Sequence, residues 1–526
     1  MGSQGNQAPL ENVRSTKVLP GSARELLERI TLIIASNRGP IEFQEEDDGS
    51  LSTKRGTGGV VTAVSAVSRY TDPIWVAAAM TPGDRIRHEQ AEAAGEPVIS
   101  PDDSDFRLRF VVTDEDVYDR YYNHISNPLL WFLQHYLWDT PRSPDIDAET
   151  WIAWNEGYVT ANRAFADEIV AAADAGTGTP VVMLQDYHLY LAPGYIREMR
   201  PDITLQHFIH IPWPDPDYWR LIPRVMRHAI CHSMLANDII GFQAPGHARS
   251  FMNTCQANLD GVELDYSTGT IHYNGRVTRV RDYPISIDVD AVRETAMEED
   301  AFRHAEHLEQ FWNEHTIIRV DRAEPSKNIV RGFHAYDRFL EKHPEFLGKV
   351  SFIAFLVPSR LEVPEYVDYL DDINTIVGRI NTKYANAAEH DGVAWEPINV
   401  FLGDDYHRGL AAMKHYDILL VNAVIDGMNL VAKEGALLNE RNGVPILSEG
   451  AGVYQQLGQY TLNVSPTDIE GTADAIYQAL TMDPAERERR ASQLRESIIE
   501  QDILEWIYQQ LRDLAEVEGL KQGATR

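Results

Sequence analysis

Short apolar runs alternate with longer helical patterns along most of the chain. In the first half the apolar runs have the length of strands, and we expect strands at ITLIIASN (30–37), PIWVAAA (73–79), RLRFVVT (107–113), PVVMLQD (180–186), TLQHFIH (204–210) and DIIGFQ (238–243). Helical patterns lie between them, such as VVTAVSAVSR (60–69) and ETWIAWNEGYVTANRAFADEIVAAA (149–173). This alternation predicts a parallel sheet covered by helices on both faces.

The same alternation starts afresh after residue 290. Its expected strands are HTIIRVDR (315–322), VSFIAFLVP (350–358), INVFLG (398–403), YDILLVNA (416–423), VPILSE (444–449) and TLNVSP (461–466). A hairpin, TIHYNGRVTRV, precedes this second set, because Asn274-Gly275 suits a type I′ turn. The last long pattern, 485–514, reads as helical throughout.

The chain has 526 residues, too many for one hydrophobic core, so the two sets predict two domains. We expect a flexible tail or short helix at 1–29, a first domain at 30–284 and a second at 285–500. Residues 501–526 are expected to form a helix that packs back on the first domain. The fold class is α/β, with two doubly wound parallel sheets facing across a cleft. Ligands of such sheets bind beyond the C-terminal strand ends, so function is sought there.

Composition adds exclusions to this picture. Hydrophobic residues make up 44% and charged residues 24%, which is ordinary for a globular protein. There is no apolar run near 18 residues and no secretory-type apolar core at the N-terminus, so a cytoplasmic protein with no membrane association is expected. Cys231 and Cys255 are too few for a disulfide framework or a zinc site, and we expect buried thiols.

The formal net charge is -33, from 47 basic and 80 acidic side chains. Such a chain should not bind nucleic acid, because phosphate backbones would be repelled. If it handles an anionic ligand, a few well-placed Arg and Lys residues must create a local positive site. Screening over roughly 8 Å permits that.

Two glycines after the first strand could meet a phosphate. The strand ends at Arg38, and GTGGVV (56–61) then opens a helix with Gly58 and Gly59. Paired glycines at a helix start let backbone N–H groups approach a phosphate closely. A purely structural turn is the alternative. The stretch is not a dinucleotide fingerprint, since the third glycine is missing.

Two neighbouring strands of the first set end in an acid and a histidine. Asp186 follows 180–185, and His210 ends 204–210. Together they could hold sugar hydroxyls or share a proton. The alternative is a capping aspartate and a buried histidine with ordinary hydrogen bonds.

Cations follow the strands of the second set. Arg322 and Lys327 are five residues apart on a strand-to-helix turn, so both could meet one diphosphate through charge-assisted contacts. Arg360 follows the next strand. The alternative is that these cations lie on solvated loops.

The stretch VIDGMNLVAKEG (424–435) joins a buried strand to a helix. Asn429 and Leu430 begin the helix, so their free N–H groups can receive a phosphate. Glu434 lies about one turn in and could accept both ribose hydroxyls, and Asp426 could accept hexose hydroxyls. This order of acid, amides and acid is typical of a nucleotide-sugar site.

Ordered motifs resemble the trehalose-6-phosphate synthases of glycosyltransferase family 20. They are YYNHISNPLLW (121–131), DYH (186–188), HIPWP (210–214), RAEPSK (322–327) and DGMNLVAKE (426–434), within matches that run from about residue 31 to 515. The resemblance implies the GT-B fold and a retaining transfer of glucose from a nucleoside diphosphate glucose, UDP-glucose foremost, to glucose 6-phosphate. The product would be α,α-trehalose 6-phosphate, made without a metal or another cofactor.

The resemblance also implies roles for single residues. The implied donor-binding residues are Gly58, Gly59, Arg322, Lys327, Asp426, Gly427, Met428, Asn429, Leu430 and Glu434. The implied acceptor-binding residues are Arg38, Tyr122, Trp131, Asp186 and Arg360. The implied catalytic residues are Arg322, Lys327, His210 and Asp426. The implied mechanism is a front-face substitution, in which the leaving phosphate helps deprotonate the acceptor hydroxyl.

Several stretches depart from the family pattern, mostly on the acceptor side. They are WVAAAM (75–80), Glu324-Pro325, VPSRLEVPEY (357–366) and Ile425. Some of these are similar to a pseudo-glycosyltransferase branch that joins cyclitols, although DGMNLVAKE is kept. Glycerol 3-phosphate or a cyclitol phosphate therefore stays open as the acceptor, as do a non-catalytic sugar-phosphate sensor and a homo-oligomer. A nicotinamide oxidoreductase is disfavoured because the fingerprint is missing.

Overall fold

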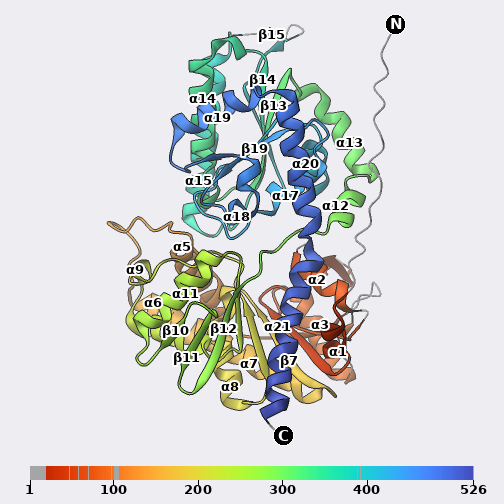
Figure 1. The fold of residues 1–526 in the computed structure, drawn as a ribbon, viewed down its shortest axis with the longest axis vertical. Helices are drawn as coiled ribbons and strands as arrows, with labels where there is room; N and C mark the ends of the chain where they lie inside the picture. Colours follow the sequence, from red (N-terminus) through yellow and green to blue (C-terminus); the bar gives the residue numbers. More distant parts are fainter. Residues whose placement is uncertain are drawn as a thin grey trace.

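The computed structural model describes residues 19–46, 48–56, 59–68, 70–95, 98–99, 106–387, 389–390 and 393–524. Two sheets lie one above the other along the long axis of the molecule (Figure 1). We call the elements around the ten-stranded sheet the N-terminal lobe and those around the six-stranded sheet the C-terminal lobe. Within the described residues, no helix combines the length and apolar character needed to cross a membrane.

The N-terminal lobe has the sheet order β10-β11-β12-β9-β8-β7-β1-β4-β6-β5. Its strands are β1 (Ile30–Ser36), β4 (Ile74–Ala78), β5 (Val98–Ile99), β6 (Arg107–Val111), β7 (Thr179–Gln185), β8 (Thr204–Phe208), β9 (Ile239–Phe242), β10 (Glu263–Asp265), β11 (Thr270–Tyr273) and β12 (Arg276–Asp282). The run from β12 to β6 is parallel, and β11 and β12 form the predicted hairpin. All six strands expected in this half are confirmed. A separate hairpin joins β2 (Ile41–Glu45) and β3 (Leu51–Arg55).

Helices flank this sheet on both faces. They are α1 (Gly21–Leu27), α2 (Gly59–Ser68), α3 (Pro82–Ala94), α4 (Glu115–Asp119), η1 (Arg120–Leu130), α5 (Trp131–Gln134), α6 (Ala148–Ile152), η2 (Ala153–Tyr158), α7 (Val159–Ala175), η3 (Tyr187–Leu189), α8 (Ala192–Met199), α9 (Pro216–Trp219), α10 (Arg224–Met234) and α11 (Pro245–Asn258). The expected helix at 149–173 contains a π-helical stretch, η2, which packs against a second one, η1. A Cβ on Gly157 would lie 2.5 Å from the Arg120 Cβ, so glycine permits this close approach.

The C-terminal lobe has the all-parallel sheet order β17-β14-β13-β18-β19-β20. Its strands are β13 (His315–Arg322), β14 (Val350–Val357), β17 (Ile398–Leu402), β18 (Ile418–Val421), β19 (Val444–Ser448) and β20 (Leu462–Val464), with a small ladder of β15 (Glu389–His390) and β16 (Val393–Ala394). The six strands expected in this half are confirmed. All eight residues of β14 pair with β13, and seven of them are buried, as strands covered on both faces should be.

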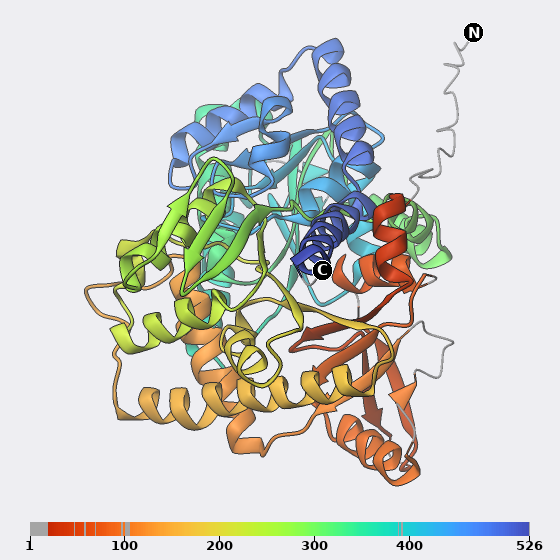
Figure 2. The ribbon, with the colours of Figure 1, turned by 60° about the horizontal axis from the view of Figure 1, so that its bottom comes forward.

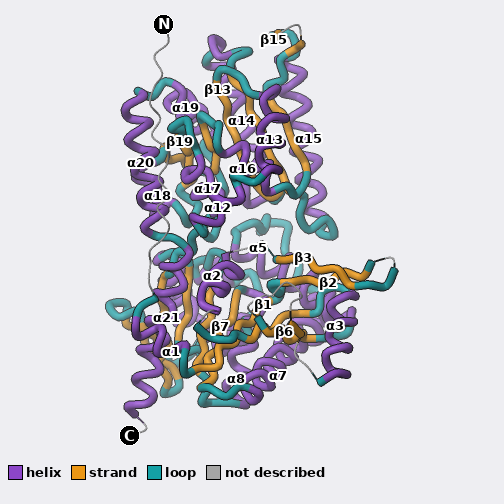
Figure 3. The backbone as a smooth tube through the Cα atoms, turned by 90° about the vertical axis from the view of Figure 1, so that its right-hand side faces the viewer, coloured by secondary structure: helices purple, strands orange, loops and turns teal. Residues whose placement is uncertain are grey.

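The helices of the C-terminal lobe complete its two outer layers. They are α12 (Val289–Thr295), α13 (Glu299–Leu308), η4 (Glu309–Phe311), η5 (Pro325–Lys327), α14 (Ile329–Lys342), η6 (Pro344–Phe346), α15 (Pro364–Tyr384), α16 (Tyr406–Met413), α17 (Leu430–Leu438), α18 (Tyr454–Leu457), η7 (Gly458–Tyr460), α19 (Ile469–Leu480) and α20 (Pro484–Glu500). Figure 3 shows this lobe above the N-terminal lobe, with α12 and α17 close to the boundary.

The last helical pattern is not continuous, contrary to the expectation for 485–514. The helix α20 ends at Glu500, and α21 (Ile503–Ala524) begins after a two-residue break. Asp502 lies in the break, where its carboxylate accepts a hydrogen bond of 3.1 Å from the Glu505 N–H. A short acid that caps a new helix start ends the preceding helix even where the apolar pattern continues.

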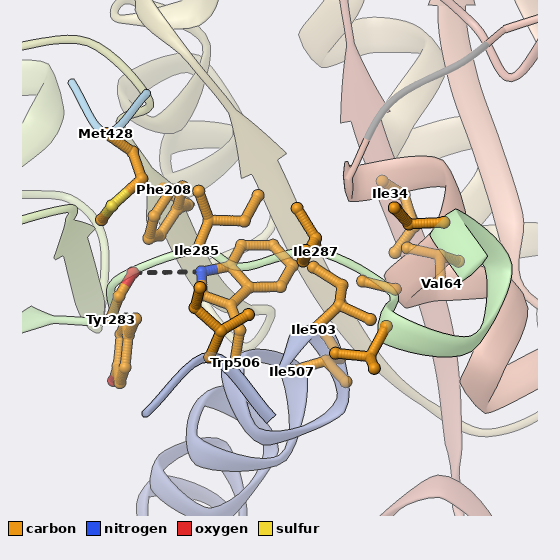
Figure 4. Packing of buried hydrophobic residues seen from close by; sticks show 14 of the residues in the cluster. Ile34, Val64, Phe208, Tyr283, Ile285, Ile287, Met428, Ile503, Trp506 and Ile507 are labelled. Carbon is orange, nitrogen blue, oxygen red and sulfur yellow. Dashed lines mark hydrogen bonds between the residues drawn. The ribbon is translucent and has the colours of Figure 1, made fainter. Parts of the chain in front are cut away.

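The break lets the end of the chain pass from one lobe to the other. The helix α20 packs on α17 and β19 of the C-terminal lobe, whereas α21 contacts α1, α2 and β8 of the N-terminal lobe. Figure 2 shows α21 beside α1, with the C-terminus on this face. Trp506 of α21 is buried and lies against Phe208 and Ile285 (Figure 4).

Two minor predictions concern the thiols and the start of the chain. Cys231 and Cys255 are free and buried, as expected. In the predicted tail, α1 is a short helix, and residues 1–18 lie outside the described part of the chain.

Candidate active site

A cavity of about 910 Å³ lies between the lobes, at the C-terminal ends of both sets of parallel strands. Most of the predicted site residues line it: Arg38, Tyr122, Trp131, Asp186, His210, Arg322, Lys327, Arg360, Asp426, Gly427, Met428, Asn429 and Leu430. Glu434 is not among the lining residues. Gly59 is the first residue of α2, and Gly58 lies outside the described residues.

The start of α17 is built from a strained asparagine. Asn429 has φ 79°, and its side-chain oxygen accepts a hydrogen bond of 3.1 Å from the Ala432 N–H. Asparagine tolerates left-handed backbone better than most residues and is a strong helix cap. The cap uses the Ala432 amide, so the first amides of the helix, at Leu430 and Val431, have no acceptor within the helix. This helix start faces the cavity with positive partial charge.

Glycines let the two lobes touch beside this helix start. A Cβ on Gly427 would lie 1.9 Å from the carbonyl oxygen of His210, which belongs to the N-terminal lobe. A Cβ on Gly452 would lie 1.8 Å from the carbonyl oxygen of Gly427 itself. Both positions therefore exclude larger residues. The glycine of the Asp-Gly pair is required by this close approach of backbones across the cavity floor.

Arg322 and Arg360 share one buried carboxylate, that of Glu324. Its oxygens lie 3.1 Å from the Arg322 guanidinium and 3.4 Å from that of Arg360, and Glu324 is 1% exposed. Both guanidiniums also face the Trp131 ring, at 5.6 Å and 3.9 Å from its centroid. The cation predicted for the donor and the cation predicted for the acceptor phosphate are thus held together by one acid and one aromatic ring.

Lys327 is paired as well. Its ammonium lies 2.5 Å from Asp426, and the same carboxylate oxygen accepts a hydrogen bond of 3.0 Å from the Asn429 side chain. This contact ties the turn after β13 to the turn after β18. The cations of the site therefore have defined positions before any ligand is present, which is the preorganisation that electrostatic catalysis needs.

Asp186 and His210 lie on adjacent strand ends of the N-terminal lobe. Asp186 has φ 68°, and its carboxylate accepts a hydrogen bond of 3.2 Å from the His210 N–H. Burial raises the pKa of Asp186 to about 7 and lowers the pKa of His210 to about 3. His210 is therefore a neutral imidazole near pH 7, with Nε2 at 3.0 Å from the Gln185 side chain. A neutral ring can bind a sugar hydroxyl but has no proton to give up as an acid.

The predicted acceptor residues Tyr122 and Arg38 line the same cavity from the N-terminal lobe. The Tyr122 ring is stacked on His188, with centroids 5.8 Å apart and an interplanar angle of 11°. The Arg38 guanidinium is 64% exposed and lies 3.1 Å from Glu42. It is thus accessible to an incoming anion.

Glu434 stands apart from the cavity wall in this structure. Its carboxylate accepts a hydrogen bond of 3.0 Å from the Tyr406 hydroxyl, and burial raises its pKa. Its place one turn into α17 leaves it near the helix start but behind the residues that line the cavity. Its role toward a ribose stays a prediction.

Three further residues that line the cavity were not predicted as site residues. Glu324 had been noted only as a departure from the family pattern, and its place directly after a strand was the available signal. His188 was visible within the Asp-Tyr-His stretch. Gln243 follows β9 and lines the cavity, but a lone glutamine at a strand end carries little information. Within the described part of the chain, no group of three or more His, Cys, Asp and Glu side chains could hold a metal ion.

Comparisons with known proteins agree with this geometry. The model of Glycosyltransferase family 20 matches residues 31–516. The alpha,alpha-trehalose-phosphate synthase [UDP-forming] of Schizosaccharomyces pombe is 32% identical over 477 residues, which cover 88% of this chain and 86% of that protein.

Two solved structures are similar over nearly their whole length. A trehalose-6-phosphate structure from E. coli bound with UDP-2-fluoro glucose has a TM-score of 0.78 at 25% identity, covering 92% of this chain and 99% of that chain. An alpha,alpha-trehalose-phosphate synthase (UDP-forming) from Burkholderia xenovorans in complex with glucose-6-phosphate has a TM-score of 0.76 at 27% identity, with the same coverage of 92% and 99%. The likeness extends over both lobes, so the two doubly wound sheets form the GT-B fold. The chain therefore belongs to glycosyltransferase family 20.

Proposed function

We propose that the protein is a retaining glucosyltransferase that moves glucose from a nucleoside diphosphate glucose, most favourably UDP-glucose, to glucose 6-phosphate. The product is α,α-trehalose 6-phosphate. One observation carries this proposal: the cations and the helix start of the C-terminal lobe line the same cavity as the proposed phosphate-binding residues of the N-terminal lobe. The similar enzymes described above, whose names include UDP-forming trehalose-phosphate synthase, support the same substrates.

The donor lies along the C-terminal lobe in this proposal. The free amides at the start of α17 and the cations of Arg322 and Lys327 bind the diphosphate. Asp426 and His210 bind the glucose hydroxyls, and Glu434 binds the ribose. Since Lys327 already contacts Asp426, one ion pair joins the sugar-binding group to the phosphate-binding group.

The transfer itself is electrostatic rather than covalent. The bond from the glucose anomeric carbon to the diphosphate oxygen breaks, and the acceptor hydroxyl attacks the same face of the sugar. The hydroxyl proton passes to the departing phosphate oxygen. Arg322 and Lys327 stabilise the negative charge that develops there, in a site where their positions are set in advance. No enzyme nucleophile and no metal ion is needed for this sequence of bonds.

The acceptor phosphate binds between the lobes. Arg38 and Tyr122 approach it from the N-terminal lobe, and Arg360 approaches it from the C-terminal lobe. Trp131 and Asp186 shape the sugar pocket beside it. A phosphorylated acceptor is favoured because it gives two arginines a dianion to bind in an otherwise acidic molecule.

A different phosphorylated acceptor is the second candidate, and one observation favours it. A smaller cavity of about 260 Å³ lies beside the acceptor rim, lined in part by Ala79, Met80 and Tyr118. It shares Asn123 with the main cavity. Free space here could admit another acceptor skeleton, such as a cyclitol phosphate. A non-catalytic sensor is disfavoured, because all four predicted catalytic residues line the main cavity.

An assay matrix tests the proposal. UDP-, ADP- and GDP-glucose are each incubated with glucose 6-phosphate, glycerol 3-phosphate, an inositol phosphate and free glucose, and the product mass is measured. We expect turnover with glucose 6-phosphate and a product of the mass of trehalose phosphate. Turnover with another acceptor alone would overturn the acceptor assignment, and no transfer in any combination would overturn the enzyme assignment.

We also propose that the chain divides functionally near residue 285, with acceptor binding at 30–284, donor binding at 285–500 and a helix at 501–526 that returns to the first part. The membership of the two sheets and the contacts of α21 with α1 and α2 support this division.

A further inference from the structure

The chain crosses between the lobes in an extended segment, residues 283–287. The backbone of every second residue in this segment is hydrogen-bonded to other parts of the chain. Tyr283 donates its N–H to the Phe242 carbonyl at 2.8 Å, and its own carbonyl accepts a hydrogen bond of 3.1 Å from the Trp506 indole (Figure 4). The Ile287 carbonyl accepts one of 3.0 Å from the Ile503 N–H. The outgoing crossing at 283–287 and the return at 503 are therefore hydrogen-bonded to each other.

The middle residue of this segment is held by both lobes at once. The Ile285 N–H donates to the Gln243 side-chain oxygen at 2.9 Å, and Gln243 directly follows β9 of the N-terminal lobe. The Ile285 carbonyl accepts a hydrogen bond of 2.8 Å from the Lys433 ammonium, and Lys433 lies in α17 of the C-terminal lobe. Ile285 and Gln243 also line the main cavity. Through the two peptide groups that flank its Cα, Ile285 connects the two halves of the site by polar contacts.

Lys433 is an unusual residue for such a place. It is 1% exposed, and burial lowers its pKa to about 7. In the described part of the chain no carboxylate forms an ion pair with it, so its removal from water is offset mainly by the Ile285 carbonyl. A neutral amine can still donate this hydrogen bond, so the contact does not depend on the charge. An apolar side chain of similar length would be expected here if packing alone mattered.

We propose that Lys433 is a positioning residue. By binding the Ile285 carbonyl in the crossing segment, it fixes the position of the donor half of the cleft relative to the acceptor half. The assignment of the two halves rests on the proposed function. The start of α17 is about one turn from Lys433, so a shift of this helix relative to Ile285 moves the diphosphate amides relative to the N-terminal lobe. Misplacement of reacting groups by about 1 Å can cost on the order of 100-fold in rate.

The test compares Lys433→Met with a matched control. Lys414→Met removes a similar contact, because the Lys414 ammonium donates to the Ala296 carbonyl at 2.6 Å in the same lobe, and neither residue lines the cavity. For Lys433→Met we expect kcat to fall about 10- to 100-fold. Because the donor-binding groups stay intact, the Kd of UDP should change less than about threefold. Hydrogen exchange of the backbone amides within 283–287 other than Pro284, which has no N–H, should become faster in Lys433→Met and not in Lys414→Met.

A double-mutant cycle with Gln243→Met sharpens the test, since both side chains bind the backbone of the same residue, Ile285. The losses in kcat from Lys433→Met and Gln243→Met should be less than additive. Additive losses, a kcat for Lys433→Met equal to that of Lys414→Met, or unchanged exchange at 283–287 would overturn the proposal. A loss of UDP affinity as large as the loss in kcat would also overturn it, because it would indicate general damage to α17.

The proposal and the proposed function can fail separately. If the wild-type protein transferred no sugar, the hydrogen exchange at 283–287 and the Kd of UDP would still decide whether Lys433 fixes the crossing segment.

Discussion

Arg360 has a left-handed backbone conformation, with φ 50°, that residues other than glycine seldom adopt. Its guanidinium lies 3.9 Å from the Trp131 centroid, 2.5 Å from the Tyr366 hydroxyl and 3.4 Å from Glu324. Strain of this kind persists only where the surroundings hold the residue in place, and it is concentrated at binding sites. At the scale of the residue, the cation that we propose to bind the acceptor phosphate is therefore fixed on a strained loop.

Arg360→Ala should raise the KM for glucose 6-phosphate about 10- to 100-fold, the effect of losing one hydrogen bond between charged groups. The KM for the nucleotide sugar should change far less, because Arg322 and Lys327 remain. Steady-state kinetics with each substrate varied in turn measures both values. Arg303→Ala is the control, since that side chain is 69% exposed and pairs with Asp300 within α13. Equal increases for the two substrates would place Arg360 outside the acceptor site.

The burial of Asp186 leads to a prediction of how the stability of the protein depends on pH. Burial raises its pKa to about 7 from its ordinary value of 3.8. Because the folded pKa lies above the unfolded one, its contribution to the free energy of unfolding is full below about pH 4 and is lost as the pH rises through 7. Asp186→Asn does not titrate, so the Tm of the variant minus that of the wild type should increase from pH 5 to pH 8. Thermal unfolding without substrates measures it, and a difference independent of pH would contradict the assigned burial.

At the scale of the element, most of the proposed donor contacts lie in the turn before α17 and at the start of this helix. Asn429 caps the start of the helix, and Gly427 permits its close approach to the other lobe. Lys433 binds the helix to the Ile285 carbonyl. Each of these three residues does something different in a stretch of seven. This explains why an Asp-Gly pair lies between β18 and α17 and why an asparagine caps the helix.

Gly427→Ala should disturb the cleft rather than the C-terminal lobe. The added Cβ would lie 1.9 Å from the His210 carbonyl oxygen, so the lobes must separate locally. We expect kcat/KM to fall about 100-fold, in line with misplacement of reacting groups by about 1 Å. Gly378→Ala in α15 is the control, since no atom lies within 4 Å of its added Cβ. Activity of Gly427→Ala within about twofold of the wild type would mean that this contact is dispensable.

The positions of the strands could be predicted because buried parallel strands are short, apolar and separated by helices. Their ends then identified Arg322, Lys327, Asp186 and His210 as neighbours in space. From the sequence a boundary is expected between residues 500 and 501, but the helical pattern over 485–514 gives no sign of the break at 501–502, because apolar positions recur on both sides of it. Only the capping role of Asp502 distinguishes the two helices.

Contacts between segments that are far apart in the chain could not be predicted from the sequence. Glu324 and Arg360 are 36 positions apart, and Lys433 and Ile285 are 148 apart. The local pattern does not specify that Glu324 holds two arginines. Nor does it specify that Lys433, in an apolar helix, contacts the crossing segment. Such pairs follow from the way the lobes pack, which local periodicity does not encode. The place of Glu434 against Tyr406 belongs to the same class.

At the scale of the whole molecule, two chain crossings connect the lobes, at 283–287 and 501–502. The helix α21 buries Trp506 against the first crossing, so the lobes share part of one hydrophobic core. The cleft between them gathers cations in a molecule whose formal net charge is -33. The cations of the cleft therefore belong to a molecule with a large overall excess of acidic side chains.

Stability should therefore increase with salt. Repulsion among the excess carboxylates destabilises the compact state, and added ions screen it over a Debye length of about 10 Å at 0.1 M and 3 Å at 1 M. We expect the Tm in 1 M KCl to exceed that at low ionic strength by several degrees, and for a chain of this length each degree corresponds to about 1 kcal/mol. A Tm that stays constant or falls over this range would show that the acidic side chains are already balanced within the fold.

The central claim is that Arg322 and Lys327 stabilise the departing diphosphate at the boundary between the lobes. The most direct test is the kcat of Arg322→Ala and of Lys327→Ala with UDP-glucose and glucose 6-phosphate, after circular dichroism has shown that both variants are folded. Each substitution should lower kcat about 100- to 1,000-fold, as loss of one preorganised donor does. Near-normal kcat in both variants would contradict the account.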